Sequence, residues 1–182
     1  MNLRACLTSL LLSIASGCGS GEGGDGSPLV PVPCAGSYDD ATFGVNFTPP
    51  PALTGPESAD SDGALRIVVW QPTILTPEPI AVALTYPIAP LDVDVNTAAQ
   101  SALDAQRNTL DADPNQTILT DQSVALDSGN DGSVLTAISN DGGTATLFVT
   151  AAGADRFATV AMVGPNDAIE TMLVYALSLC VE

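Results

Sequence analysis

The last third of the sequence alternates apolar residues with small or polar ones between short turns, and this pattern limits the fold most. Residues 133–138 (SVLTAI) and 144–150 (TATLFVT) flank the turn SNDGG, whose residues readily adopt the positive φ that a tight hairpin requires. Residues 157–163 (FATVAMV) and 169–179 (IETMLVYALSL) repeat the alternation. Side chains two positions apart share one face of a strand. The sequence therefore predicts antiparallel strands here, the last of them over 169–179.

The first half of the chain contains further candidate strands. Residues 41–47, 64–70 and 80–86 are rich in apolar and β-branched residues, and 91–95 (LDVDV) alternates. Residues 48–63 contain three consecutive prolines and then small and acidic residues, which predicts a loop.

One segment favours a helix. Between residues 97 and 112, apolar residues such as Leu103 and Leu110 recur at 3.6-residue spacing, Asn96 or Thr97 is suited to cap the start, and Pro114 ends the pattern. Short strands with frequent turns are typical of β-sandwiches. We predict an all-β antiparallel sandwich with one inserted short helix at about 97–112.

The C-terminal segment also resembles a known family. Residues 135–179 look like the last strands of a bacterial immunoglobulin-like (Ig-like) domain, the type repeated in invasin-like adhesins. The resemblance rests on a threonine-rich strand, an Asp/Asn-Gly turn and an Ala-Thr-Val-x-Ala strand, at Thr136, Asp141, Gly142, Ala145, Ala158, Thr159, Val160 and Ala161. It covers about a quarter of the chain, and the first half departs from the family pattern. It implies an Ig-like sandwich and a role in binding or adhesion.

The N-terminus has the features of an export signal. Arg4, a short apolar run and small residues before Cys18 are typical of a signal peptide over residues 1–17. The sequence Ala15-Ser16-Gly17-Cys18 resembles the lipobox of bacterial lipoproteins, although that family usually has leucine where Ala15 stands. The resemblance implies that Cys18 carries the lipid. An ordinary cleavage site is the alternative.

A glycine-rich stretch follows Cys18. Its composition predicts a flexible tether, so that 18–33 would hold the lipidated cysteine and the tether, and 34–182 the sandwich domain. In Gram-negative lipoproteins an aspartate after the cysteine signals inner-membrane retention. Gly19 at that position therefore implies an exported outer-membrane lipoprotein of the cell envelope, with the membrane as a partner through the lipid anchor.

The charge balance excludes one class of partner. The chain has 21 acidic residues and four arginines, with no lysine and no histidine. Loss of Arg4 with the signal peptide would leave a net charge of −18. Nucleic-acid binding depends on Lys and Arg contacts to phosphate and is not expected. A protein or glycan at the cell surface is the expected partner class, and cations are the natural counterpart of the charge.

Two cysteines remain in the predicted domain. An even pair in an exported protein predicts a disulfide, so Cys34 and Cys180 would join the two ends of the domain. A reactive thiol is the alternative reading, but the chain has no histidine to activate it.

One segment suggests Ca²⁺, the only cofactor considered. Asp111, Asp113 and Asn115 occupy positions 1, 3 and 5 of an EF-hand-like loop. However, Gln116 and Gln122 stand where that loop has glycine and glutamate. The alternative is a helix end followed by a polar turn. Asp92 and Asp94 form a second oxygen-rich group.

Catalysis has little support in the sequence. The absence of His and Lys removes histidine triads and Schiff-base lysines, and Trp70 is predicted to lie in the core. We expect a binding or adhesion protein and not an enzyme. A structural envelope protein without a specific ligand and a hydrolase with paired carboxylates are the alternatives. An exposed apolar patch would favour the first, and a pocket with two close aspartates the last.

Overall fold

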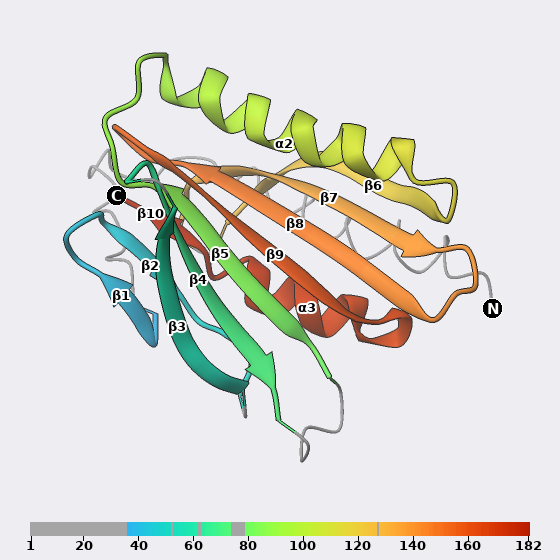
Figure 1. The fold of residues 1–182 in the computed structure, drawn as a ribbon. Helices are drawn as coiled ribbons and strands as arrows, with labels where there is room; N and C mark the ends of the chain where they lie inside the picture. Colours follow the sequence, from blue (N-terminus) through green and yellow to red (C-terminus); the bar gives the residue numbers. More distant parts are fainter. Residues whose placement is uncertain (1–35, 52, 62, 74–78, 127) are drawn as a thin grey trace, which may run out of the picture. The chain divides into compact units, whose positions relative to one another are not determined.

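The computed structural model describes residues 36–51, 53–61, 63–73, 79–126 and 128–182. Within them, a seven-stranded antiparallel sheet has the order β3–β4–β5–β9–β8–β7–β6, and a smaller sheet has the order β1–β2–β10 (Figure 1). The strands are β1 (Tyr38–Asp40), β2 (Val45–Phe47), β3 (Leu53–Ser61), β4 (Leu65–Pro72), β5 (Ala81–Pro87), β6 (Gln116–Ala125), β7 (Asp131–Ser139), β8 (Thr144–Ala152), β9 (Phe157–Pro165) and β10 (Cys180–Val181). The helices are α2 (Val95–Ala112) and α3 (Ile169–Ala176), with a 3-10 turn at Asn166–Ala168. The predicted all-β sandwich with an inserted helix is confirmed, with α3 in addition.

One face of the large sheet forms the main core. Cross-strand pairing aligns Val149, Val160, Leu84 and Val68 in one row, and each is fully buried. The helix α3 packs on β8 and β9, while the small sheet lies over the β4 end of this face. There Trp70 is 3% exposed and meets the Phe47 ring at 5.6 Å, so its predicted core role is confirmed.

The helix α2 covers part of the opposite face. Leu103 and Leu110 pack on Leu135 and Ala137, with Ile118 and Phe148 beside them. The main contacts of α2 are with β6, β7, β8 and β9, and Figure 1 shows the helix lying above these strands. Among the described residues, neither helix is long and apolar enough to cross a membrane.

The start of α2 corrects two predictions. The helix begins at Val95, and Asp94 caps it by accepting a hydrogen bond from the Thr97 backbone N–H at 3.1 Å. Neither Asn96 nor Thr97 is the cap, and 91–95 is not a strand. The alternation in this segment reflects a capping aspartate and its neighbours, since aspartate is a preferred residue at the N-cap.

Other boundaries also differ from the predictions. The predicted loop 48–63 contains β3, the predicted strand 41–47 is shortened to β2, and the polar turn after α2 leads into β6. The predicted last strand is largely α3, in which Ile169, Met172, Leu173 and Ala176 are buried at helical spacing. The remaining strand predictions and the turn at 139–143 are confirmed.

Candidate functional site

The α2 side of the large sheet continues beyond the helix as an open surface. One cross-strand row runs from Leu135 to Phe148, then to Ala161, Ala83 and Val69. The first two of these side chains pack against α2. The main contacts of α2 reach β9 and do not extend to β5 and β4, which hold Ala83 and Val69. The same row therefore begins under a helix and ends on a part of the sheet that no described helix covers on this face.

We call this uncovered apolar area the open strip. It consists of Leu65, Ile67 and Val69 on β4, Ala81 and Ala83 on β5, and Ala161 and Val163 on β9. Three polar side chains, those of Gln71, Thr85 and Thr159, lie among them on the same face. Leu65 is 37% exposed and Val163 42%, and the other five are half-buried. An apolar sheet face normally packs against another element, so a largely apolar exposed area of this kind marks an interaction surface.

The described charges closest to the open strip are acidic. Glu57 on β3 pairs in register with Val69, so its side chain lies on the same face as the strip. Arg66 pairs with Tyr86 and lies on the opposite face, whereas Arg107 reaches Asp121 on the far edge strand β6. The strip is therefore bordered by negative charge and by no described arginine.

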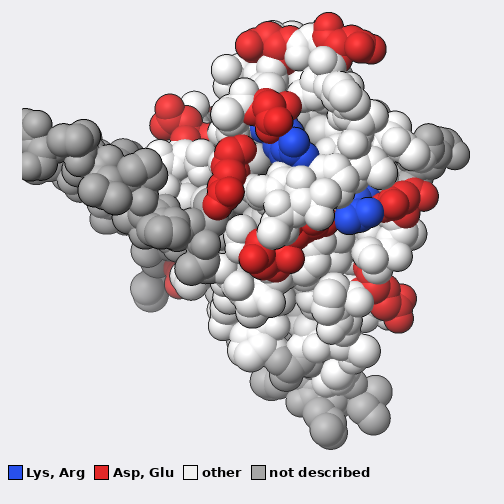
Figure 2. Space-filling view, turned by 90° about the vertical axis from the view of Figure 1, so that its left-hand side faces the viewer, with Lys and Arg blue, Asp and Glu red and all other residues white. Residues whose placement is uncertain are grey.

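Every described arginine is already bound to aspartate. Arg66 pairs with Asp40 and Asp60, Arg107 with Asp104 and Asp121, and Arg156 with Asp155. Figure 2 shows two of these basic patches on one side of the molecule, each lying against acidic side chains. The remaining acidic surface has no basic side chain of its own to offset it within the described residues.

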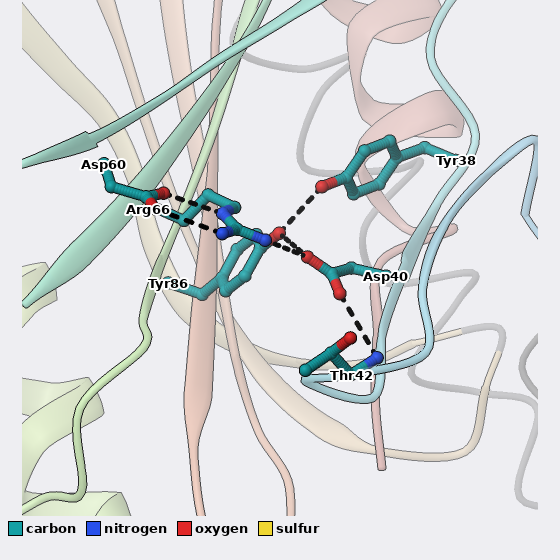
Figure 3. Close-up of polar contacts among 6 residues, drawn as sticks. All are labelled: Tyr38, Asp40, Thr42, Asp60, Arg66 and Tyr86. Carbon is teal, nitrogen blue, oxygen red and sulfur yellow. Dashed lines mark hydrogen bonds and ion pairs between the residues drawn. The ribbon is translucent and has the colours of Figure 1, made fainter. Parts of the chain in front are cut away.

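A hydrogen-bonded network joins the small sheet to the large one (Figure 3). The Tyr86 hydroxyl donates to Asp40 Oδ2 at 2.7 Å and lies 2.7 Å from the Tyr38 hydroxyl. Because the single proton of Tyr86 goes to Asp40, Tyr38 donates to Tyr86. Arg66 donates to the same Asp40 oxygen at 2.8 Å and holds Asp60 through two further bonds. The network connects β1 with β3, β4 and β5.

The protonation states in this network suit a structural role. Burial alone would raise the pKa of Asp40, but hydrogen bonds from Tyr86 and Arg66 outweigh it and lower that pKa below its usual value. Burial, together with the bonds to Tyr38 and Asp40, raises the pKa of Tyr86 above its usual value. Asp40 is thus ionised and Tyr86 neutral at pH 7. Neither group is poised to exchange a proton there, as a general acid or base must.

Two surface pockets provide no pair of carboxylates. A pocket of about 500 Å³ lies between the first half of α2 and the ends of β6, β7 and β8, and Asp131 is the one carboxylate among its lining residues. A second, of about 270 Å³, is lined by Tyr38, Trp70, Leu53 and several prolines, without an acidic side chain. The two-carboxylate arrangement of a glycosidase is found in neither.

The predicted calcium ligands lie at the end of α2. Asp111 is exposed in the last turn of the helix, and Asp113 is the C-cap. Asp113 Oδ1 accepts hydrogen bonds from both the backbone and the side-chain nitrogen of Asn115, at 2.9 and 3.2 Å. Asp94 is engaged in capping the other end. No group of three or more His, Cys, Asp or Glu side chains suited to a metal occurs in the described part of the chain, and calcium binding stays a prediction.

The cysteine predictions fall mostly outside the described residues. Cys18 and Cys34 both lie outside the described residues. The lipidation of Cys18 and the Cys34–Cys180 disulfide therefore stay predictions. Cys180 is buried in β10 and pairs in register with Asn46 of β2. A Cβ placed on Gly36 would lie 2.6 Å from the backbone of Phe47, the residue that follows Asn46 on β2. The described chain therefore begins close to the strand that holds Cys180.

The open strip was not identified from the sequence. The alternation of β4, β5 and β9 predicted one buried face for each strand, but nothing in it indicated where α2 would lie on the sheet. Comparison with protein-family models and with curated proteins gave no match to this chain.

Proposed function

We propose that the protein is an exported cell-envelope lipoprotein whose β-sandwich binds a partner through the open strip. The observation that carries this proposal is the largely apolar surface over β4, β5 and β9 next to α2. A purely structural envelope protein has no need of such a surface. A hydrolase with paired carboxylates needs a pocket that holds two close acidic side chains, and neither described pocket provides them. The lipobox-like sequence at Cys18 supports the location.

The location is tested by fractionation. Wild-type protein is expected in the membrane fraction with the mass of an acylated chain, because acyl chains retain a protein at a bilayer. Cys18→Ser is expected to release it to the soluble fraction. A mature protein whose mass shows no acyl chain would refute the anchor.

Binding is tested with a matched pair of variants. Exported full chain carrying Cys18→Ser is immobilised and exposed to solubilised native envelope. Val163→Asp in the open strip is expected to abolish capture of whatever the wild type retains, whereas Val174→Asp, on the 66%-exposed position of α3, is expected to leave it unchanged. Equal capture by both variants would contradict binding through the strip.

The predicted bridge is part of the same proposal. An exported domain whose described start contacts Phe47, beside the pairing partner of Cys180, is well placed for a Cys34–Cys180 bond. Alkylation with and without reductant should give different masses. Equal masses would show that the bond does not form.

A further inference from the structure

Resting on that proposed function, we propose that the open strip binds a basic amphipathic helix of a partner protein, laid beside α2 on the same face of the sheet. The partner class follows from three properties of the strip: its width, the small side chains along one flank of α2, and the sign of the surrounding charge.

The width of the strip fits one helix. Three adjacent strands at a spacing of about 4.8 Å, with their side chains, form a surface about one helix diameter wide, roughly 10 Å. α2 borders this surface on one side, and the exposed strand β3 borders it on the other. A second sheet would need a broader surface than remains between these borders. The large sheet would then hold two helices on one face, one from each protein.

The flank of α2 beside the strip permits close approach. Leu103 and Leu110 define the side of the helix that faces the sheet, and Arg107 points toward β6, where it binds Asp121. At 3.6 residues per turn, Ala98, Ala102 and Thr109, together with the longer side chain of Gln106, then lie on the flank away from β6, which is the flank beside the strip. Ala98 and Ala102 are only half-buried although they are small and apolar. Small side chains allow a neighbouring helix to pack at the usual interaxial distance of about 8–10 Å.

The charge selects a basic partner. Glu57 stands beside Val69 on the strip face, and Asp92 is exposed in the segment between the Leu65 end of the strip and α2. The described arginines are all engaged with aspartates, so basic groups on a partner would meet acids that lack a positive neighbour. A second copy of this chain would bring together two molecules of net charge −17, which opposes self-association through the strip.

The probe is a synthetic 18-residue helical peptide with leucine and alanine on one face and lysine on the rest, labelled for fluorescence anisotropy. Two matched peptides serve as controls, one with the same composition in scrambled order and one with glutamate in place of lysine. The protein is the exported full chain carrying Cys18→Ser. The amphipathic lysine peptide is expected to bind at least about tenfold more tightly than either control peptide.

The strip is tested by variants that add negative charge. Leu65→Asp and Val163→Asp are each expected to weaken binding of the lysine peptide by about tenfold or more. An added aspartate can only strengthen attraction to lysine, so a loss reports the apolar contact. Val174→Asp makes the same change at an exposed position on α3, outside the strip, and is expected to stay within about twofold of wild type.

Four results would overturn the helix proposal. Equal binding of the scrambled peptide would show that general charge attraction suffices, and equal binding to Leu65→Asp and Val163→Asp would place the contact elsewhere. A dimer in sedimentation experiments that Val163→Asp disrupts would identify a second copy as the occupant. If the peptide fails but envelope capture still depends on Val163, the proposed function stands and the helical, basic nature of the partner is wrong.

Discussion

The two faces of the seven-stranded sheet are built from the same strands and yet differ in what covers them. Along β5, Val82 and Leu84 point to the main core and are at most 1% exposed, whereas Ala81 and Ala83 point the other way and are only half-buried. The first face packs against α3 at β8 and β9 and against the small sheet at β4, and the second face packs against α2 over part of its width. Strand alternation thus gives two apolar faces, and the placement of the helices decides which part of them is available to a partner.

The two faces also differ in whether their charged side chains have partners within the chain. The main-core face ends in Arg66 and Tyr86, whose polar groups are all engaged with Asp40, Asp60 and Tyr38. The open strip ends beside Glu57, for which no basic partner is found among the described residues. A charge on the covered face is matched within the chain, while the charge at the strip is left for solvent or for another molecule.

A matched pair of leucines gives the sharpest test of the comparison. Leu84→Ala on the covered face is expected to lower the free energy of unfolding by about 2–5 kcal/mol, because it removes fully buried methyl groups and leaves a cavity. Leu65→Ala on the open strip, at a 37%-exposed position, is expected to cost less than about 1 kcal/mol. Urea unfolding measures both. Similar losses would show that the strip is covered in solution.

Tyr86→Phe tests the polar end of the covered face. The change removes the hydroxyl that bonds Asp40 and Tyr38, and it is expected to cost about 1–3 kcal/mol. Thermal unfolding would show it as a lower Tm. The exposed pair of Asp155 and Arg156 provides the control, since Asp155→Asn is expected to leave Tm unchanged.

The same network predicts a pH dependence. The pKa of Asp40 is lower in the folded protein, so the unfolded chain takes up a proton at a higher pH than the folded one does. Its contribution to stability is complete above the unfolded pKa of about 3.9 and is lost as pH falls toward the folded value. The stability difference between wild type and Tyr86→Phe should therefore shrink in this acid range. A difference that stays constant down to pH 2 would mean that Asp40 is not the group involved.

Asp94→Ala tests whether α2 defines the border of the strip. Loss of the N-cap bond to Thr97 is expected to cost about 1 kcal/mol. Fraying of the first turn should also raise amide exchange near Val95. Asp92→Ala removes a neighbouring acid that caps nothing, and it is expected to leave both measurements unchanged.

The smallest expected effect concerns cations. With this net charge, salt should stabilise the fold by screening, and calcium should do no more than sodium at equal ionic strength. Tm measurements under matched conditions decide the matter. A calcium-specific rise that disappears in Asp111→Ala or Asp113→Ala would establish the predicted site, and it would add a bound charge at the end of α2.

The sequence predicted most strands and α2 because their periodicity is long and regular. It missed β6, which follows the polar turn after α2, and it missed β3, since prolines and acids normally argue against a strand. β3 lies at the edge of the sheet, where one side needs no hydrogen-bond partners, and a register shift between Thr54 and Glu57 accommodates Gly55 and Pro56. Such residues protect an edge from further pairing.

The helix α3 was mistaken for a strand because its apolar run fits both periods. Met172, Leu173 and Ala176 satisfy the helical spacing, while alternate residues of the same run satisfy the strand spacing. Short apolar runs are ambiguous until tertiary packing selects one period. The open strip was unpredictable for a related reason, since it depends on where α2 packs and not on the strands that form it.

The strand order has a consequence for how the chain folds. β3–β5 and β6–β9 are two meanders in which each strand pairs with its neighbour in sequence, and they join only where β5 meets β9. Paired residues at this seam, such as Ala83 and Ala161, lie more than 70 positions apart, whereas Ala152 and Phe157 pair across a short turn. Closing so long a loop costs entropy that local contacts do not repay, so the seam should form last and open first. The open strip crosses this seam. A ligand bound to the strip would hold the two meanders together. Binding should therefore slow amide exchange in β5 and β9 more than in any other strand.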